Sequence, residues 1–334
     1  MCTGGGIGDV LLATPCMRAL RSKYAQVAAL TAPAQAPVLS GNPDLDQVLL
    51  ADVGFGELRA RIARERFDAA IVTWATPQTA LLPFVAGIPV RVGQARRPYS
   101  FLFTKRVTVR SELGDHSTHW TQVLLDYARA LDCEGTQTVP TFVVPPGAQA
   151  RVDALLSAGN VARPYLVLHP TRGIAASRAR WPVESLAALG RALQNAFNMP
   201  LVVTGSALDR DVTGAVASAA GALSLAGRTT IGEFGALAAG AHVVVAMDSG
   251  PMHVAAAVGA PTVGIFALQS DEPQRWAPLG ARVAVVRGTY PCPPWHRKET
   301  CPDFACIREL PVMTVVQAAR DLLDSGDRAA RLES

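Results

Sequence analysis

The chain has 334 residues, of which 49% are hydrophobic and 17% are charged, and its formal net charge is +4. This length predicts two domains, and the composition is typical of a compact globular protein. The basic residues lack the dense stripe of a nucleic-acid-binding surface, so we expect no nucleic acid partner. The apolar runs are shorter than a membrane span, and no secretory signal pattern opens the chain. We therefore expect a cytoplasmic protein.

The six cysteines are too few, in a chain of this length, for a disulfide framework. Cys292, Cys301 and Cys306 cluster around His296, which raises the alternative of a metal site. Their spacing lacks the close pair of cysteines that common zinc sites contain. We therefore favour reduced, packed thiols, and we expect neither a metal ion nor a cofactor.

Short runs of β-branched residues alternate with longer amphipathic stretches along the chain, which predicts an α/β fold with a doubly wound parallel sheet in each half. The boundary lies at 138–147, which contains three prolines and a glycine. The predicted strands are 27–31, 47–50, 68–74, 89–93, 165–169, 200–204, 222–225, 242–246 and 261–266. Helices are predicted at 57–66 and 314–323, and an ordered loop at 288–311.

The segment 4–15, with the sequence GGGIGDVLLATP, has glycines that let the backbone approach a ligand and adopt positive φ. It is not a dinucleotide fingerprint, because Asp9 stands where a glycine is required, and it lacks the Gly-Lys-Ser/Thr of a P-loop. A strand normally precedes such a turn, yet only three residues precede Gly4. Either that strand is nearly absent or the functional start lies upstream.

Asp9 has two alternative roles. An acidic group at this place would repel a pyrophosphate, which favours a base that takes a proton from an acceptor hydroxyl. An aspartate before an apolar helix is also a preferred N-cap, and the spacing alone favours the cap. Both roles coexist only if one oxygen stays available. A helix N-terminus lowers the pKa of a carboxyl group, so burial would have to offset that effect.

A second motif follows the predicted strand 242–246. The strand runs into Asp248, Ser249 and Gly250, and a helix with an early proline follows. The carboxyl end of a strand and the start of a helix bind phosphates through backbone N–H groups, and His253 lies in the first turn. The alternative is that Asp248 and Ser249 only cap the helix while His253 packs in the core.

A third motif follows the predicted strand 165–169, where a polar loop contains Arg172, Arg178 and Arg180. Their guanidinium groups could neutralise a leaving nucleoside diphosphate without a metal ion. At least one of the three is expected to be an ordinary solvated arginine, and the spacing does not choose among them.

Taken together, these segments resemble the glycosyltransferase family that contains the bacterial heptosyltransferases of lipopolysaccharide core synthesis. The matching pieces occur in the expected order over nearly the whole chain, which is more specific than any single motif. They are Gly8-Asp9-Val10-Leu11 with Thr14-Pro15, Asn42-Pro43 before Asp46-Gln47-Val48, His169-Pro170 with Trp181-Pro182, LAGRTT at 225–230, and Asp248-Ser249-Gly250 with His253.

The resemblance implies a GT-B architecture, in which two Rossmann-like doubly wound domains face each other across a cleft. Residues 1–145 would bind the acceptor and residues 146–334 the nucleotide sugar, and the alternative that the final helix packs back on the N-terminal domain stays open. The resemblance also implies inverting transfer without a metal ion, with Asp9 as the base. Gly6 and Gly8 would lie on the acceptor side.

On the donor side, the resemblance implies contacts with the diphosphate and sugar of an ADP-heptose-like donor. The residues that would make them are Thr171, Asp248, Ser249, Gly250 and His253. The family often has a lysine where Ala179 stands here, so Arg178 or Arg180 is expected to supply the charge. Ser224 stands where some members place an acidic residue on the donor ribose.

The expected function is thus transfer of a heptose, or a related sugar, from an ADP-sugar to the hydroxyl of a glycan, glycolipid or small-molecule acceptor. Peripheral association with the inner face of the cytoplasmic membrane stays open. Transfer to a small natural product is one alternative. A GT-B nucleotide-sugar epimerase is another, although it would need acid and base residues beyond His253. A binding module without catalysis is disfavoured by Asp9.

Overall fold

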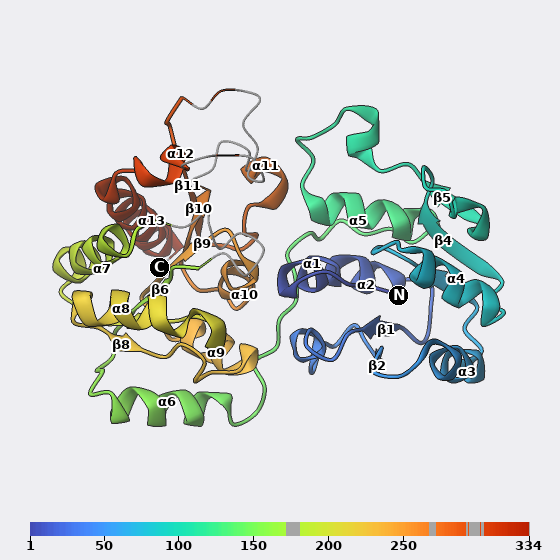
Figure 1. Cartoon of the computed structure of the whole chain (residues 1–334), viewed down its shortest axis with the longest axis horizontal. Helices are drawn as coiled ribbons and strands as arrows, with labels where there is room; N and C mark the ends of the chain where they lie inside the picture. Colours follow the sequence, from blue (N-terminus) through green and yellow to red (C-terminus); the bar gives the residue numbers. More distant parts are fainter. Residues whose placement is uncertain (172–180, 267–271, 292, 294–300, 302–303, 334) are drawn as a thin grey trace. The chain divides into compact units, whose positions relative to one another are not determined.

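A computed structural model describes residues 1–171, 181–266, 272–291, 293, 301 and 304–333, with side chains up to residue 325. The chain forms two compact units, Met1–Val143 (unit 1) and Val144–Ser334 (unit 2). Each unit contains parallel strands covered by helices (Figure 1), and the predicted α/β class is confirmed. Within the described part of the chain, no helix is both long and apolar enough to cross a membrane.

The strands of unit 1 are short, and every strand pair in it is parallel. One sheet pairs β1 with β2, and the other has the order β3-β4-β5. The strands are β1 (Ala28–Thr31), β2 (Gln47–Leu50), β3 (Ala69–Ile71), β4 (Val90–Gln94) and β5 (Lys105–Val107). β5 was not predicted, because its sequence of two basic residues and one valine carries no strand signal.

Cys2 connects these two sheets. It forms parallel bridges with Leu30 and with Val72, so it lies where a central first strand would run. Its N–H donates to Ile71 O at 2.7 Å, and the N–H of Thr3 donates to Leu30 O at 3.0 Å. Cys2 thus pairs with both sheets directly before the glycine turn.

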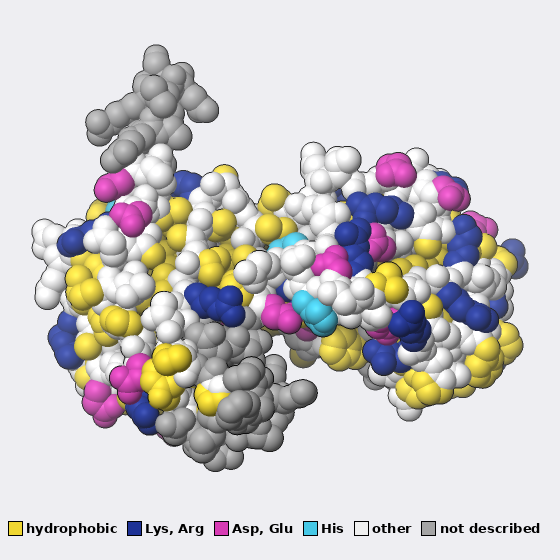
Figure 2. Space-filling view, turned by 90° about the horizontal axis from the view of Figure 1, so that it is seen from above, with side chains coloured by type: hydrophobic (Ala, Val, Ile, Leu, Met, Phe, Trp, Pro, Cys, Tyr) yellow, Lys and Arg dark blue, Asp and Glu magenta, His cyan; other side chains and the backbone are white. Residues whose placement is uncertain are grey.

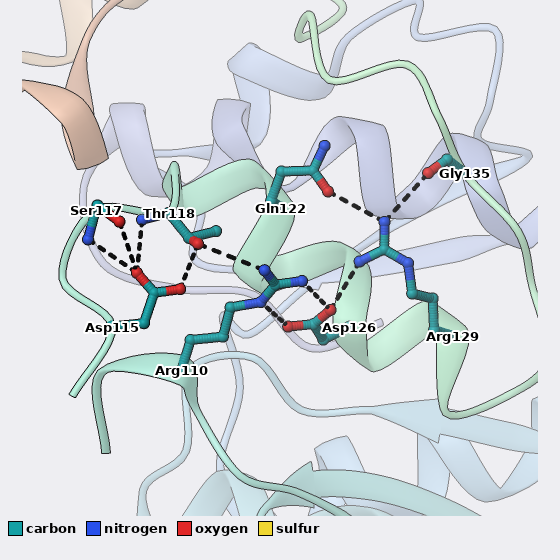
Figure 3. Close-up of polar contacts among 8 residues, drawn as sticks. All are labelled: Arg110, Asp115, Ser117, Thr118, Gln122, Asp126, Arg129 and Gly135. Carbon is teal, nitrogen blue, oxygen red and sulfur yellow. Dashed lines mark hydrogen bonds and ion pairs between the residues drawn. The ribbon is translucent and has the colours of Figure 1, made fainter. Parts of the chain in front are cut away.

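Helices cover the sheets of unit 1. They are α1 (Ile7–Leu12), α2 (Thr14–Leu20), α3 (Phe55–Glu65), α4 (Pro77–Val85) and α5 (Trp120–Arg129), with the short 3-10 helices η1 (Ala36–Leu39), η2 (Ser100–Leu102) and η3 (Arg110–Leu113). A polar network fixes η3 on α5 (Figure 3). Arg110 makes a bidentate ion pair with Asp126, with N···O distances of 2.6 and 2.9 Å, and Arg129 contacts the same carboxylate at 2.7 Å.

Unit 2 has one six-stranded parallel sheet with the order β11-β10-β9-β6-β7-β8. The strands are β6 (Leu166–His169), β7 (Leu201–Val203), β8 (Leu223–Ser224), β9 (Val243–Met247), β10 (Thr262–Phe266) and β11 (Val283–Arg287). From β6 the chain moves outward through β7 to β8, returns beside β6 with β9, and continues to β10 and β11. The direction of winding therefore reverses between β6 and β9, and such a switch point is where open α/β sheets bind ligands.

The central strands β6, β9 and β10 are buried along their whole length, as expected for a parallel sheet with helices on both faces. The helices are α6 (Ala148–Ala158), α7 (Val183–Phe197), α8 (Arg210–Ala220), α9 (Ile231–Ala239), α10 (Gly250–Ala257), α11 (Pro273–Trp276), α12 (Ala305–Arg308) and α13 (Val312–Glu333), with the 3-10 helix η5 (Ala207–Asp209). Val315, Val316 and Ala319 of α13 are buried in the core of unit 2.

Candidate active site

Asp9 lies in the first turn of α1, but it is not the N-cap residue. Gly6 occupies that position with extended backbone angles, and Asp9 is the third helical residue. The Gly6 N–H donates to Asp9 Oδ2 at 2.7 Å. The carboxylate therefore reaches back over the glycine turn and satisfies one backbone donor of the helix start.

The glycines of this turn make room for the carboxylate. Gly5 has φ +86°, and a Cβ built on it would lie 2.8 Å from Asp9 Cγ, inside contact distance. Gly4 packs against the Trp74 ring, where a Cβ would lie 3.0 Å from Cγ and from Cδ1. Each of these two glycines is thus required by a specific neighbour, and any larger residue at Gly5 would displace Asp9.

Burial raises the pKa of the Asp9 carboxyl group above its ordinary value, although backbone hydrogen bonds from Gly6 and from Asp9 itself oppose that change. Desolvation thus outweighs the stabilisation of the carboxylate at the helix start. The carboxylate is consequently a stronger base than an exposed aspartate.

Trp74 lies beside the glycine turn, but it was not predicted from the sequence as a site residue. Its ring lies against Gly4, while 48% of its surface stays exposed. It follows β3, where Thr73 N–H donates to Cys2 O at 3.1 Å and so holds the two segments side by side. The only signal in the sequence was a tryptophan at the carboxyl end of a predicted strand.

The switch point of unit 2 brings together two predicted segments that are far apart in the sequence. His169 of β6 pairs with Ala246 of β9, so the residues that follow these strands emerge side by side. Thr171 follows β6 and is 5% exposed. Asp248 follows β9, and its N–H donates to Ile265 O at 3.1 Å.

Ser249 is the N-cap residue of α10, but its side chain does not cap the helix. Its hydroxyl donates instead to Met247 O at 2.9 Å. In the first turn, Pro251 has no N–H and the N–H of Met252 bonds Ser249 O at 3.1 Å. Gly250 therefore carries the amide through which this helix start can bind an anion.

The buried His169 precedes Thr171 in the chain by two residues, and Asp209 contacts Thr171. His169 is 7% exposed, its Nδ1 lies 3.0 Å from Thr204 Oγ1, and burial lowers its pKa to about 4 against the opposing charge of Asp209. The imidazole is therefore neutral at physiological pH. Asp209 Oδ2 accepts hydrogen bonds from Ser206 Oγ at 2.6 Å and from Thr171 Oγ1 at 3.3 Å. Asp209 was not predicted, because its contact with Thr171 is not local in the sequence.

The remaining predicted residues are distributed as follows. Ser224 ends β8, two strands from β6 and so roughly 10 Å away across the sheet. His253 is buried in the first turn of α10. Gly8 is the second residue of α1. Arg178 and Arg180 lie outside the described residues.

The cysteine cluster is only partly described, because Cys292 and His296 lie outside the described residues. Cys306 is buried and belongs to the core of unit 2, and the partly buried Cys301 packs against that core. The Phe304 N–H lies 3.4 Å from Cys301 Sγ. Among the residues that the structure describes, no group of three or more His, Cys, Asp and Glu side chains is arranged to hold a metal ion.

Two relatives with similar sequences have the same name. The lipopolysaccharide heptosyltransferase 2 of Salmonella typhimurium is 28% identical over 301 residues, covering 84% of this chain and 85% of the relative. The protein of the same name from Escherichia coli is 27% identical, with the same coverage of both chains.

Solved structures have the same fold. A glycosyl transferase of family 9 from Veillonella parvula superposes with a TM-score of 0.80 at 18% identity, covering 97% of this chain and 96% of that one. The ADP-heptose lipopolysaccharide heptosyltransferase II of E. coli gives 0.78 at 21% identity, covering 98% of both chains. At such identities the likeness shows the fold alone, which is the predicted GT-B architecture.

The sequence profile of glycosyltransferase family 9 (heptosyltransferase) matches residues 55–303, more than half of the chain. The chain therefore belongs to glycosyltransferase family 9, as the resemblance predicted, and it is a glycosyltransferase.

Proposed function

We propose that this enzyme transfers a heptose from an ADP-heptose donor to a sugar hydroxyl of a lipopolysaccharide core acceptor. The relatives named lipopolysaccharide heptosyltransferase support this choice of donor sugar and acceptor, and an E. coli heptosyltransferase has been solved with ADP. The observation that carries the proposal is the Asp9 turn, in which a partly buried carboxylate with a raised pKa accepts the Gly6 N–H through Oδ2.

In the proposed reaction, the acceptor hydroxyl oxygen attacks the anomeric carbon of the donor from the face opposite to the diphosphate. The new bond between this oxygen and the anomeric carbon forms while the bond from that carbon to the phosphate oxygen breaks, and ADP leaves with its electron pair. The hydroxyl proton goes to Asp9. Because Oδ2 already accepts the Gly6 N–H, Oδ1 is the oxygen that would take the proton.

The donor would bind in unit 2 at the switch point between β6 and β9. The amide of Gly250 and the partial positive charge of the α10 N-terminus would stabilise the diphosphate. Thr171 emerges from the neighbouring strand β6, and Ser224 would meet the donor ribose farther along the sheet. Arg178 or Arg180 would add the charge that replaces a metal ion. In this assignment, unit 2 binds the donor and unit 1 the acceptor.

The acceptor of this reaction would be a glycolipid, and the enzyme would act on the cytoplasmic side of the membrane that carries it. A small natural product with a suitable hydroxyl is the alternative acceptor. The two are distinguished by comparing initial rates on the isolated lipopolysaccharide core precursor and on its delipidated oligosaccharide. Equal kcat/KM values on both would remove the glycolipid part of the proposal.

The test of the base is Asp9→Asn, assayed by ADP release at saturating ADP-heptose. Removing a general base lowers kcat by about 10²–10⁴-fold, whereas ADP should still raise the melting temperature, because its proposed site lies in unit 2. Asp52→Asn is the matched control, since Asp52 makes only a surface ion pair with Arg61 at 3.1 Å. Near-normal turnover of Asp9→Asn would show that Asp9 is not the base.

A further inference from the structure

Helix α4 of unit 1 is apolar on its outer face as well as on its inner face. Its sequence, PQTALLPFV, contains no charged residue. Ala80, Leu82 and Pro83 are buried, yet Leu81 is 36% exposed and Phe84 is 49% exposed. A surface helix normally presents polar side chains to solvent, so the outer face of α4 calls for a partner.

Phe101 of η2 extends this face. It is 72% exposed, more than any other aromatic side chain among the described residues. The two elements are joined through Arg91, whose Nε donates to Leu102 O at 2.8 Å and whose guanidinium lies 5.3 Å from the centre of the Phe84 ring. Leu81, Phe84 and Phe101, here called the apolar patch, are thus displayed by two adjoining elements.

Basic residues accompany the apolar patch. Residues 69–110 contain six basic residues and no acidic one. They are Arg91, Arg96, Arg97, Lys105, Arg106 and Arg110. Arg110 is neutralised by Asp126, and Lys105 lies 3.9 Å from Asp132. Arg96 and Arg97 are exposed and are separated from η2 by two residues. Figure 2 shows Lys and Arg side chains beside hydrophobic ones, with some Asp and Glu side chains among them, on the face of unit 1 that is turned to the viewer.

We propose that the apolar patch and the basic residues beside it form a docking surface for an anionic phospholipid membrane. Exposed phenylalanine and leucine side chains bury their apolar surface at the level of the lipid headgroups, while arginine and lysine side chains bind the phosphates around them. The single sign of charge over 42 residues fits a uniformly anionic surface. A protein partner would instead need a defined set of complementary charges.

This inference rests on the proposed function, because a membrane-docking surface would bring the enzyme to a glycolipid acceptor. Its test, however, involves no sugar transfer. The full-length protein is sedimented with vesicles of phosphatidylcholine and phosphatidylglycerol, and with vesicles of phosphatidylcholine alone. We expect binding to the anionic vesicles only, weakened by added salt because the Debye length shortens. The assay contains neither donor nor acceptor, so a failure of the proposed transfer reaction would leave its result unchanged.

Two double variants separate the contributions. Arg96→Gln with Arg97→Gln should lower the partition coefficient by roughly 30-fold, since each basic residue near an anionic membrane contributes about 1 kcal/mol. The charge-matched control is Arg59→Gln with Arg64→Gln, two exposed positions on α3.

Phe84→Ser with Phe101→Ser should lower the partition coefficient by at least about tenfold. Phe55→Ser is its control, because Phe55 is a 38% exposed phenylalanine on α3. All variants should keep the melting temperature of the native protein within a few degrees, because the side chains removed are exposed.

Three outcomes would overturn the inference. The first is the absence of binding to anionic vesicles, and the second is equal binding to neutral ones. The third is equal binding by the patch variants and their controls. Sedimentation of the protein without vesicles tests for a dimer. If the native protein is a dimer that does not bind vesicles, and the Phe84→Ser, Phe101→Ser variant is a monomer, the apolar patch binds a second copy of the chain instead.

Discussion

Replacing Gly5 by alanine tests the proposed geometry of Asp9 directly. Gly5 has φ +86°, a region that costs a non-glycine residue roughly 1–2 kcal/mol. In addition, the new methyl group would lie 2.8 Å from Asp9 Cγ, about 1 Å inside a normal contact between carbon atoms. The carboxylate must move, and a displacement of about 1 Å in a catalytic group can lower the rate by about 100-fold.

The matched control is Gly114→Ala. Gly114 also has φ +86°, but a Cβ built on it meets no atom within 4 Å. Gly114→Ala should lose about 1–2 kcal/mol of stability in thermal or urea denaturation, and Gly5→Ala at least as much, because it adds the contact with Asp9. Only Gly5→Ala should lose kcat, measured by ADP release at saturating donor and acceptor, and the KM for the donor should change little. A kcat for Gly5→Ala within about threefold of that of Gly114→Ala would refute the reasoning, because it would mean that the carboxylate is not required where the turn holds it.

Two further predictions concern the ionisation of Asp9 and the donor side. The pKa of Asp9 is raised in the folded protein, so the folded state binds its proton more tightly and stability falls as pH rises from the ordinary value of 3.8 through the raised one. Asp9→Asn should therefore melt at a higher temperature than the native protein at pH 7 and lose that advantage in acid. The kcat of the native enzyme should fall as pH drops through the raised pKa of Asp9. A lower melting temperature of Asp9→Asn at pH 7 would contradict the expected direction of the stability change. Thr171→Val should raise the KM for the donor about tenfold with little change in kcat. Thr171→Ser keeps the hydroxyl that donates to Asp209, so its KM should stay near that of the native enzyme. Equal KM values for Thr171→Val and the native enzyme would exclude the hydroxyl from the site.

The strands and turns that follow local patterns were predictable from the sequence. The strand 47–50 was predicted with its observed bounds, and the turn between β9 and α10 lies where the glycine and proline signals indicated. β11 was missed although its sequence, VAVVR, is typical of a strand, because it precedes an irregular segment. β5 could not be found in this way, since backbone pairing with β4 stabilises it whatever its side chains are.

The candidate site was predictable only as separate pieces. The sequence predicted candidate phosphate-binding residues after two strands. It did not predict that β6 and β9 are neighbours, because strand order depends on long-range pairing. Trp74 and Asp209 were missed for the same reason, since each acts through a residue distant in the sequence. The alternative that Asp9 is the N-cap was wrong by three positions, because the helix begins within the glycine turn itself.

The segments on both sides of the glycine turn hold Asp9 in position. The backbone pairing of Cys2 and Thr3 places the start of the turn, yet it involves only a few hydrogen bonds. The stronger constraint lies after the turn, where Val10, Leu11 and Leu12 of α1 are at most 1% exposed. Burying three such side chains stabilises α1 by several kcal/mol, more than a few strand hydrogen bonds contribute. Asp9 is therefore held from its carboxyl-terminal side by the core of unit 1.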